Sequence, residues 1–86
     1  MKLNIGSVVM ANAGRDNGGF FVVVNLDENY CFIADGKSRK ISSPKRKNIK
    51  HICHTNSVID INGITDKKLR TLLSYIKEDE SNKEVI

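Results

Sequence analysis

Apolar residues in the first half of the chain come in short runs that favour β-strands. Val8–Met10 is one such run, and Phe20–Val24 is a second and stronger one, because β-branched and aromatic side chains pack well on a pleated sheet. Neither run alternates apolar with polar positions, so both faces of each strand are expected to be partly covered. A small closed barrel with a helix packed on its outside would cover both faces.

Polar segments separate the predicted strands. Ala13–Gly19 contains three glycines, an Asp and an Asn, which predicts a tight turn with positive φ angles. A second turn at Asp27–Asn29 leads into a third strand, Tyr30–Ala34. Asp35-Gly36 follows at once and predicts a type I′ hairpin, with the returning strand beginning at Lys40-Ile41.

The segment after this hairpin is basic and contains the single proline of the chain. Pro44 lacks a backbone N–H donor and disfavours a central strand, so Ser42–Lys50 is expected to form an exposed loop. Residues 49–54 then alternate, with Ile49, His51 and Cys53 on one face. This period of two predicts a last barrel strand of about six residues.

The hydrophobic period changes in the last third of the chain. Four aliphatic residues recur at the spacing of one helical stripe: Leu69, Leu72, Leu73 and Ile76. The helix is predicted to run from Asp66 to about Glu78, with Thr65 as its N-cap and Asp66 at the positive end of the helix dipole. Ile64 and Leu69 are spaced to form a hydrophobic staple across that cap. The stripe needs an apolar partner, and the barrel supplies one; polar residues from 79 onward are expected to fray.

Length and composition restrict the class of protein. At 86 residues, with 40% hydrophobic and 28% charged residues, the chain is expected to form one small soluble domain with little room for a deep cleft. No apolar run approaches the roughly 20 residues that span a bilayer, and the N-terminus does not resemble a secretory signal. A cytoplasmic monomer that does not bind membranes is therefore expected. In that compartment Cys31 and Cys53 are expected to be buried thiols.

The net charge of +4 is unevenly distributed. Residues 35–54 contain seven Lys or Arg residues against a single Asp, so this segment alone exceeds the net charge of the whole chain. All seven cations lie between Lys37 and Lys50 without an intervening carboxylate, and they repel one another unless an anion lies alongside. Such a concentrated field attracts polyanions, and phosphate contacts from Lys and Arg supply most of the sequence-independent affinity for nucleic acids.

The stretch Ile5–Val24 resembles the KOW motif. KOW segments carry a glycine before the first strand, a polar turn with a glycine, a central glycine and a β-branched second strand. These roles are filled here by Gly6, Gly14, Gly18 and Val22–Val24. The basic continuation, Ala34–Lys37, Arg39-Lys40 and Pro44–Lys47, is similar to KOW-containing large-subunit ribosomal proteins of the archaeal and eukaryotic type and to their short bacterial relatives. The resemblance covers roughly residues 4–56.

The resemblance implies a mainly β fold, an SH3-like barrel of about five strands that binds structured RNA, often ribosomal RNA. We therefore expect the barrel over residues 1–62, the packed helix over 63–80 and a frayed polar tail over 81–86. Arg39 and Arg46 are the best candidates for forked phosphate or guanine contacts, because guanidinium is planar and bidentate. The predicted RNA-binding residues are Asn12, Gly14, Arg15, Lys37, Arg39, Lys40, Lys45, Arg46, Lys47 and Lys50. Asp16 is expected to cap its turn.

Other functions fit the sequence less well. His51, Cys53 and His54 invite a zinc hypothesis, but a strand places His54 on the opposite face from the other two. No metal or other cofactor is expected. No catalytic residue is expected either, because no group orients Cys53 as a nucleophile. Most aromatic residues are expected in the core, with Tyr30 the best exposed candidate for stacking. Ribosomal proteins are expected as further partners. The alternative function is a protein-interaction module that docks on the translation or transcription machinery, which the acidic residues from Glu78 to Glu84 favour.

Overall fold

The computed structural model describes residues 3–83, apart from the side chains of Arg15 and of residues 79–83. It contains five strands, two short 3-10 helices and one α-helix. In chain order these are β1 (Ser7–Ala11), η1 (Gly14–Asp16), β2 (Phe20–Leu26), β3 (Tyr30–Ala34), β4 (Lys45–Asn48), η2 (Ile49–His51), β5 (Ile52–Val58) and α1 (Asp66–Lys83). Within residues 3–83, no helix has both the length and the apolar composition needed to cross a lipid bilayer.

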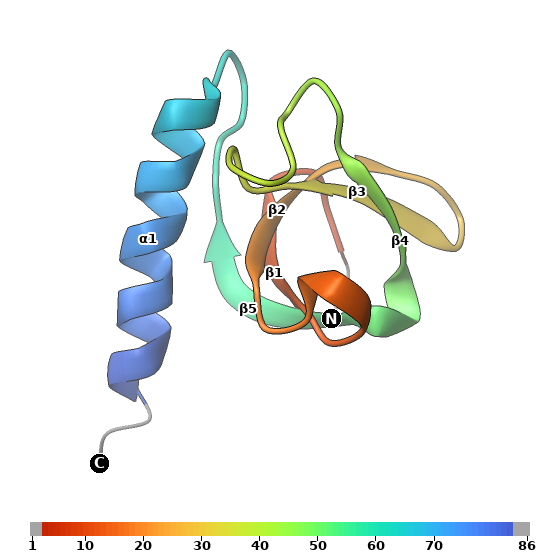
Figure 1. The fold of residues 1–86 in the computed structure, drawn as a ribbon, viewed down its shortest axis with the longest axis horizontal. Helices are drawn as coiled ribbons and strands as arrows, with labels where there is room; N and C mark the ends of the chain where they lie inside the picture. Colours follow the sequence, from red (N-terminus) through yellow and green to blue (C-terminus); the bar gives the residue numbers. More distant parts are fainter. Residues whose placement is uncertain (1–2, 84–86) are drawn as a thin grey trace.

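The strands form one antiparallel sheet in the order β4-β3-β2-β1-β5. The short η2 joins β4 to β5, the two strands at the ends of that order, so the sheet curls round on itself (Figure 1). Helix α1 lies outside the curled sheet. The predicted fold class, a mainly β SH3-like barrel of five strands with a packed C-terminal helix, is confirmed.

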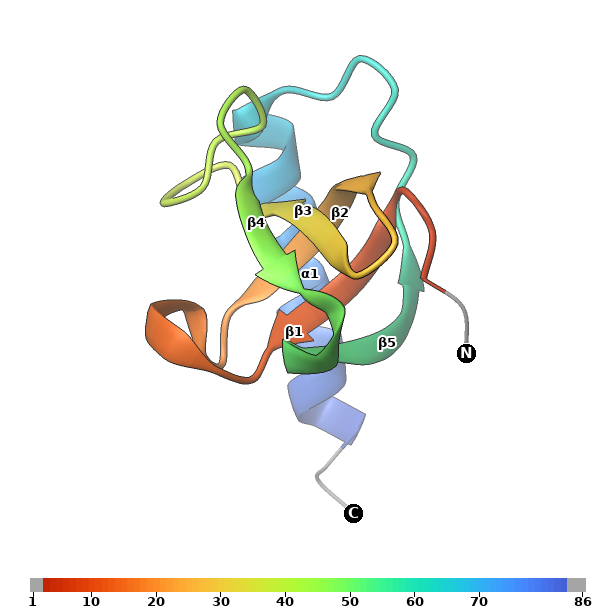
Figure 2. The same cartoon turned by 90° about the vertical axis from the view of Figure 1, so that its right-hand side faces the viewer.

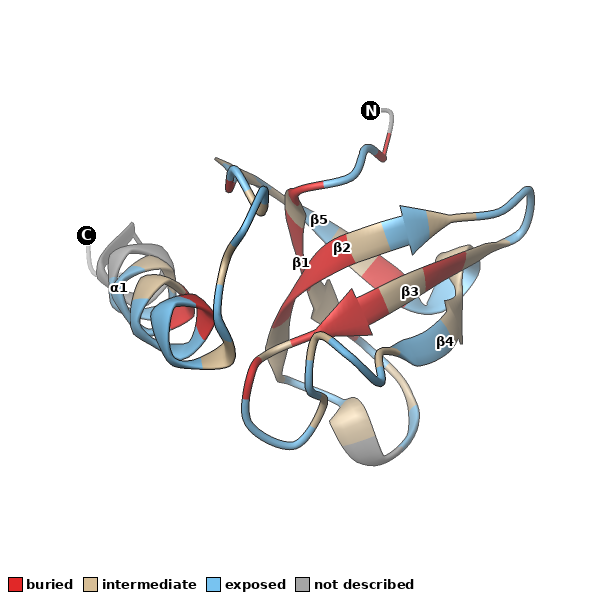
Figure 3. Ribbon diagram, turned by 90° about the horizontal axis from the view of Figure 1, so that it is seen from above, coloured by how far each residue is buried: buried red, intermediate tan, exposed pale blue. Residues whose placement is uncertain are grey.

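Two apolar clusters cover the two faces of the sheet. The first, inside the barrel, includes Val9, Phe21, Val23 and Ile33. The second joins the outer face to α1, and its buried residues are Val8, Val22, Ala34, Ile59, Leu69 and Leu73. Figure 3 shows buried segments in red both on the strands and on α1. Adjacent valines in β1 and β2 therefore point into different clusters, because successive strand side chains point to opposite faces. This arrangement explains why the strand sequences are apolar at consecutive positions, as predicted.

The start of α1 follows the sequence prediction. The Thr65 hydroxyl accepts a hydrogen bond from the Lys68 N–H at 3.1 Å, which is the geometry of an N-cap. Ile64 and Leu69 pack in the same apolar cluster. The helix continues to Lys83, past the end predicted near Glu78. Residues 84–86 of the predicted tail lie outside the described part of the chain.

The structure corrects the path of the chain between residues 35 and 58. No residue other than glycine has a positive φ in the described chain, so Asp35-Gly36 does not form the predicted type I′ hairpin. The predicted returning strand at Lys40-Ile41 is also wrong, because these residues lie in the turn before β4. Part of the predicted exposed loop is instead strand β4, which pairs with β3 through Ile33↔Lys45 and Cys31↔Lys47. Pro44 precedes this edge strand, where its missing N–H costs no ladder bond.

The last strand is also displaced from its predicted position. Residues 49–51 form η2, capped by the Asn48 Oδ1 atom, which accepts from the Lys50 N–H at 3.1 Å. Strand β5 consequently begins at Ile52 and continues to Val58. Side-chain capping offers the backbone an alternative to a β-ladder. The alternation in residues 49–54 therefore placed the start of the strand three residues too early.

Candidate nucleic-acid interface

The basic segment, Lys37–Lys50, runs from the N-terminal end of α1 to η2. It starts beside the N-terminal end of α1, passes through the loop before β4, follows β4 and ends in η2. Figure 2 shows β4 and η2 in the foreground, with α1 behind the barrel. The loop end of this segment therefore lies against α1, whereas β4 and η2 lie on the side of the barrel that α1 leaves free.

The loop that carries Lys37 and Lys40 is held by hydrogen bonds at its base. The Asp35 Oδ1 atom accepts from the Lys37 N–H at 2.9 Å and from the Arg39 N–H at 2.8 Å. Both lysine side chains are exposed. Because the Asp35 carboxylate shapes this turn, Lys37 and Lys40 project from an ordered backbone.

Helix α1 also bonds to this loop, through the side chains of Asp66 and Arg70. The Asp66 Oδ1 atom accepts from the Ile41 N–H at 2.8 Å, and the Arg70 guanidinium donates to the Gly36 carbonyl at 2.6 Å. Gly36 has a φ of +77°, and a Cβ there would collide with the Asp66 backbone carbonyl. Only glycine allows the loop to approach the helix so closely. The position of the basic loop therefore depends on the docking of α1.

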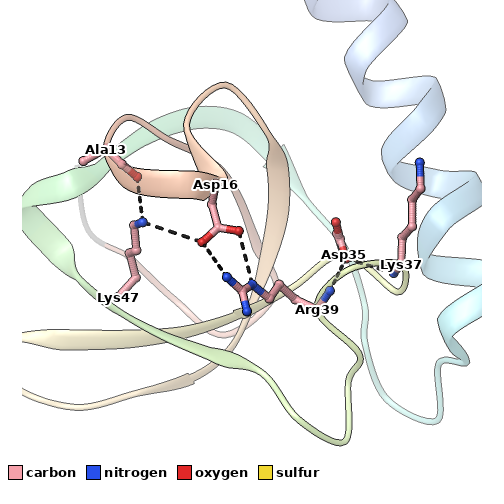
Figure 4. Close-up of polar contacts among 6 residues, drawn as sticks. All are labelled: Ala13, Asp16, Asp35, Lys37, Arg39 and Lys47. Carbon is pink, nitrogen blue, oxygen red and sulfur yellow. Dashed lines mark hydrogen bonds and ion pairs between the residues drawn. The ribbon is translucent and has the colours of Figure 1, made fainter.

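Asp16 pairs with two of the seven cations (Figure 4). Its carboxylate oxygens accept from the Arg39 Nε and Nη2 atoms, each at 3.2 Å. The Lys47 Nζ atom lies 3.7 Å from Asp16 Oδ2 and donates to the Ala13 carbonyl at 2.7 Å. The Asp16 and Lys47 side chains are only 9% and 10% exposed, against 29% for Arg39. These contacts tie the η1 turn to β4 and to the basic loop.

Gly14 belongs to the same contact. It has a φ of +73°, and a Cβ at this position would lie 3.3 Å from Lys47 Nζ. The glycine therefore allows the turn to adopt its conformation and leaves room for the lysine. For Arg39 and Lys47 the neighbouring anion is Asp16, which lies far from the basic segment in the sequence and packs against both cations in the fold.

The other predicted cations are exposed. Lys37, Lys40, Lys45, Arg46 and Lys50 all present solvent-accessible side chains. Asn12 is also exposed, and its amide donates to Cys53 Sγ at 3.2 Å. The Arg15 side chain lies outside the described residues. The structure thus divides the predicted site into exposed cations and two cations, Arg39 and Lys47, that hold the site together; RNA contact by any of them stays a prediction.

The thiols and histidines do not form a metal site in the described part of the chain. No three His, Cys, Asp or Glu side chains gather there closely enough to hold an ion. Both cysteines are free, Cys31 buried as predicted and Cys53 half-buried. Burial raises the pKa of the Cys31 thiol, because an apolar interior disfavours the charged thiolate.

We expect Asp16→Asn to reduce the free energy of unfolding by about 1–2 kcal/mol. The amide keeps the shape of the carboxylate but loses the charge that pairs with Arg39 and with the nearly buried Lys47, and removing one partner of such a pair leaves the other uncompensated. We place the loss below that of a fully buried pair because Arg39 is partly exposed. Urea denaturation measures it.

Asp60→Asn is the matched control for this prediction. Asp60 is exposed, and its Oδ1 atom accepts from the Asn62 N–H, a bond that the amide oxygen preserves. The change at Asp60 should stay within about 0.5 kcal/mol. In a Lys47→Met background the loss from Asp16→Asn should shrink, because part of its partner is already gone. An equal loss in both backgrounds would mean that Asp16 does not couple to Lys47.

The sequence of this chain is similar to those of ribosomal proteins. No protein-family model matches the chain. The chain is 33% identical over 86 residues to the large ribosomal subunit protein eL14 of Staphylothermus marinus, covering 98% of this chain and 90% of that protein. It is 36% and 39% identical over 84 residues to the eL14 proteins of Pyrobaculum calidifontis and Pyrobaculum islandicum, covering 88% of this chain and 82% of each relative. The resemblance to large-subunit ribosomal proteins predicted from sequence is confirmed.

Proposed function

The chain belongs to the eL14 family of large-ribosomal-subunit proteins, and from this premise we propose that it is a non-enzymatic component of the large subunit that binds structured ribosomal RNA. The relatives are named as proteins of that subunit. The proposed role places the chain with the ribosomes of the cytoplasm. It also gives the basic segment a partner of opposite charge.

The observation that carries the proposal is the row of exposed cations that begins in the loop held by the N-terminal end of α1 and continues along β4 and η2. Three exposed lysines, Lys40, Lys45 and Lys50, follow one another along the loop, β4 and η2. Lys side chains act as point charges toward phosphate oxygens and release counterions from RNA when they bind. Double-stranded RNA is recognised mostly by shape and by contacts to phosphates and 2′-hydroxyls, which suits a barrel with several exposed lysines.

Crosslinking in cells followed by sequencing of the bound RNA tests this proposal. We expect crosslinks to concentrate in the RNA of the large subunit, and we expect the tagged chain to sediment with that subunit in low salt. Sedimentation with the subunit should be lost in high salt, since the contacts are mainly electrostatic. Crosslinks spread evenly over cellular RNAs would contradict residence on the large subunit.

A second role, docking on another protein, is supported by an apolar patch at the C-terminal end of β5, the end farther along the strand from η2. Val58 is 73% exposed and Ile5 is 54% exposed, and both line one groove together with Ile61. Neighbouring exposed apolar residues are typical of protein contacts. A pull-down whose partners survive nuclease treatment would favour this role, whereas partners lost with the RNA would favour RNA binding.

A further inference from the structure

Arg46 and Tyr30 form a stacked pair on the outer face of the β3–β4 hairpin. The Arg46 guanidinium carbon lies 4.5 Å from the centroid of the Tyr30 ring. Tyr30 is paired with Asn48, and Phe32 with Arg46, so Arg46 reaches diagonally across the strands to the tyrosine. Arg46 is exposed and Tyr30 is half-buried. The side of the guanidinium that faces away from the ring therefore offers a flat, cationic surface.

A groove adjoins this pair. It is lined by Glu28, Asn29, Tyr30, Asn48, Ile49 and Lys50. Its two walls, the β2–β3 turn and η2, are joined by a hydrogen bond from the Ile49 N–H to the Asn29 carbonyl at 3.1 Å. The Asn48 Oδ1 atom accepts a hydrogen bond from the Lys50 N–H at 3.1 Å. This bond fixes the side chain, and its NH₂ group can donate to a ligand. The groove is thus preformed and combines an aromatic ring with polar groups.

We propose that this groove binds one unpaired nucleobase of RNA, an inference that rests on the proposed function and adds a stacking site to it. Unpaired bases stack on aromatic rings and on guanidinium planes, and their edges hydrogen-bond to side chains. Tyr30, which lines the groove and holds Arg46 over its ring, supplies the stacking surface, and the Asn48 amide donates to a base edge. Lys50 reaches the phosphate of the same nucleotide.

The charge of Glu28 distinguishes a base from a phosphate as the occupant of the groove. A carboxylate in the lining repels a phosphate, whereas it accepts hydrogen bonds from the N–H groups of a base edge. The second tyrosine, Tyr75, is 65% exposed on α1, and its neighbouring surface is lined only by Thr65 and by residues of α1, including Lys68 and Leu72. We therefore place the base at Tyr30 and use Tyr75 as the matched control.

Two RNA duplexes of the same sequence, one with a single extruded 2-aminopurine nucleotide and one without, test the inference. Wild-type protein should bind the bulged duplex more tightly and quench the 2-aminopurine fluorescence by stacking. Tyr30→Leu should reduce the preference for the bulged duplex about 5- to 150-fold, the range of one lost base–aromatic stack. Tyr30→Phe, which restores the aromatic face, should recover most of the quenching.

The controls separate this inference from the proposed function. Tyr75→Leu should keep both the preference and the quenching. Arg46→Gln, at an exposed position that tolerates change, should reduce the quenching, and it decides the matter if Tyr30→Leu fails to fold. Wild-type binding to both duplexes with equal affinity, or a preference that survives Tyr30→Leu and Arg46→Gln, would overturn the stacking site and leave RNA binding intact. Binding to neither duplex would overturn both proposals.

Discussion

A variant that loses four exposed lysines is expected to bind structured RNA about 10³-fold more weakly in roughly 0.1 M salt. The four changes, each to Gln, are at Lys37, Lys40, Lys45 and Lys50. Each phosphate contact contributes about 0.9 to the slope of log K against log salt, so the slope should fall by about three to four units. Salt titrations of binding, monitored by fluorescence anisotropy, measure both quantities. The fold should persist, because all four side chains are exposed.

The matched control removes lysines from the helix. Lys67, Lys68 and Lys77 are exposed on α1, which lies behind the barrel from β4 and η2 (Figure 2) and reaches the loop only through its N-terminal end. Their joint change to Gln should alter the slope by less than about one unit. Equal effects from the two variants would show that RNA responds to total charge, and the face formed by the loop, β4 and η2 would lose its special role.

The elements with strong hydrophobic patterns could be predicted from the sequence. The apolar runs gave β1, β2 and β3, and the stripe with its Thr65 cap gave the start of α1. Consecutive apolar positions in β2 also predicted that both faces of the strand are covered. The structure agrees, since Phe21 and Val23 face the barrel interior while Val22 faces the helix. These features depend on side chains close together in the sequence, and local patterns therefore record them.

Strand β4 could not be predicted in the same way. Its sequence, Lys-Arg-Lys-Asn, has no apolar period, since the strand lies at one end of the sheet order and pairs only with β3. Its backbone hydrogen bonds, and not side-chain burial, define it as a strand. A basic run is consequently compatible with an edge strand as well as with a loop.

The role of Asp16 was also missed, although its residue type carried a weak signal. A turn aspartate usually bonds to nearby backbone, and such a bond explained the residue fully at the sequence level. Its partners are instead Arg39 and Lys47, which are more than twenty residues away along the chain and are brought close only when β4 pairs with β3. A lone carboxylate near a basic segment in a folded barrel is therefore a candidate for an internal partner, which reduces the number of cations free for RNA.

Leu69→Ala is expected to lower the free energy of unfolding by about 3–4 kcal/mol, the largest single-residue effect on stability that we predict. Leu69 is fully buried in the cluster that joins α1 to the sheet, next to Val8 and Val22. Truncation leaves a cavity that the rigid sheet cannot fill, and the lost transfer energy adds to the cavity term. Urea denaturation gives the change in midpoint, with the m-value unchanged if the fold is kept.

The same substitution should also loosen the basic loop, since α1 holds it. The Ile41 N–H is bonded to Asp66, so its hydrogen exchange should accelerate when the helix is less firmly docked. Leu72→Ala, at a half-buried position of the same helix, is the control and should cost clearly less in stability. A Leu69→Ala variant with a lowered midpoint but unchanged Ile41 protection relative to global unfolding would mean that the loop keeps its position without the helix. RNA binding would then depend on the barrel and Asp16 alone.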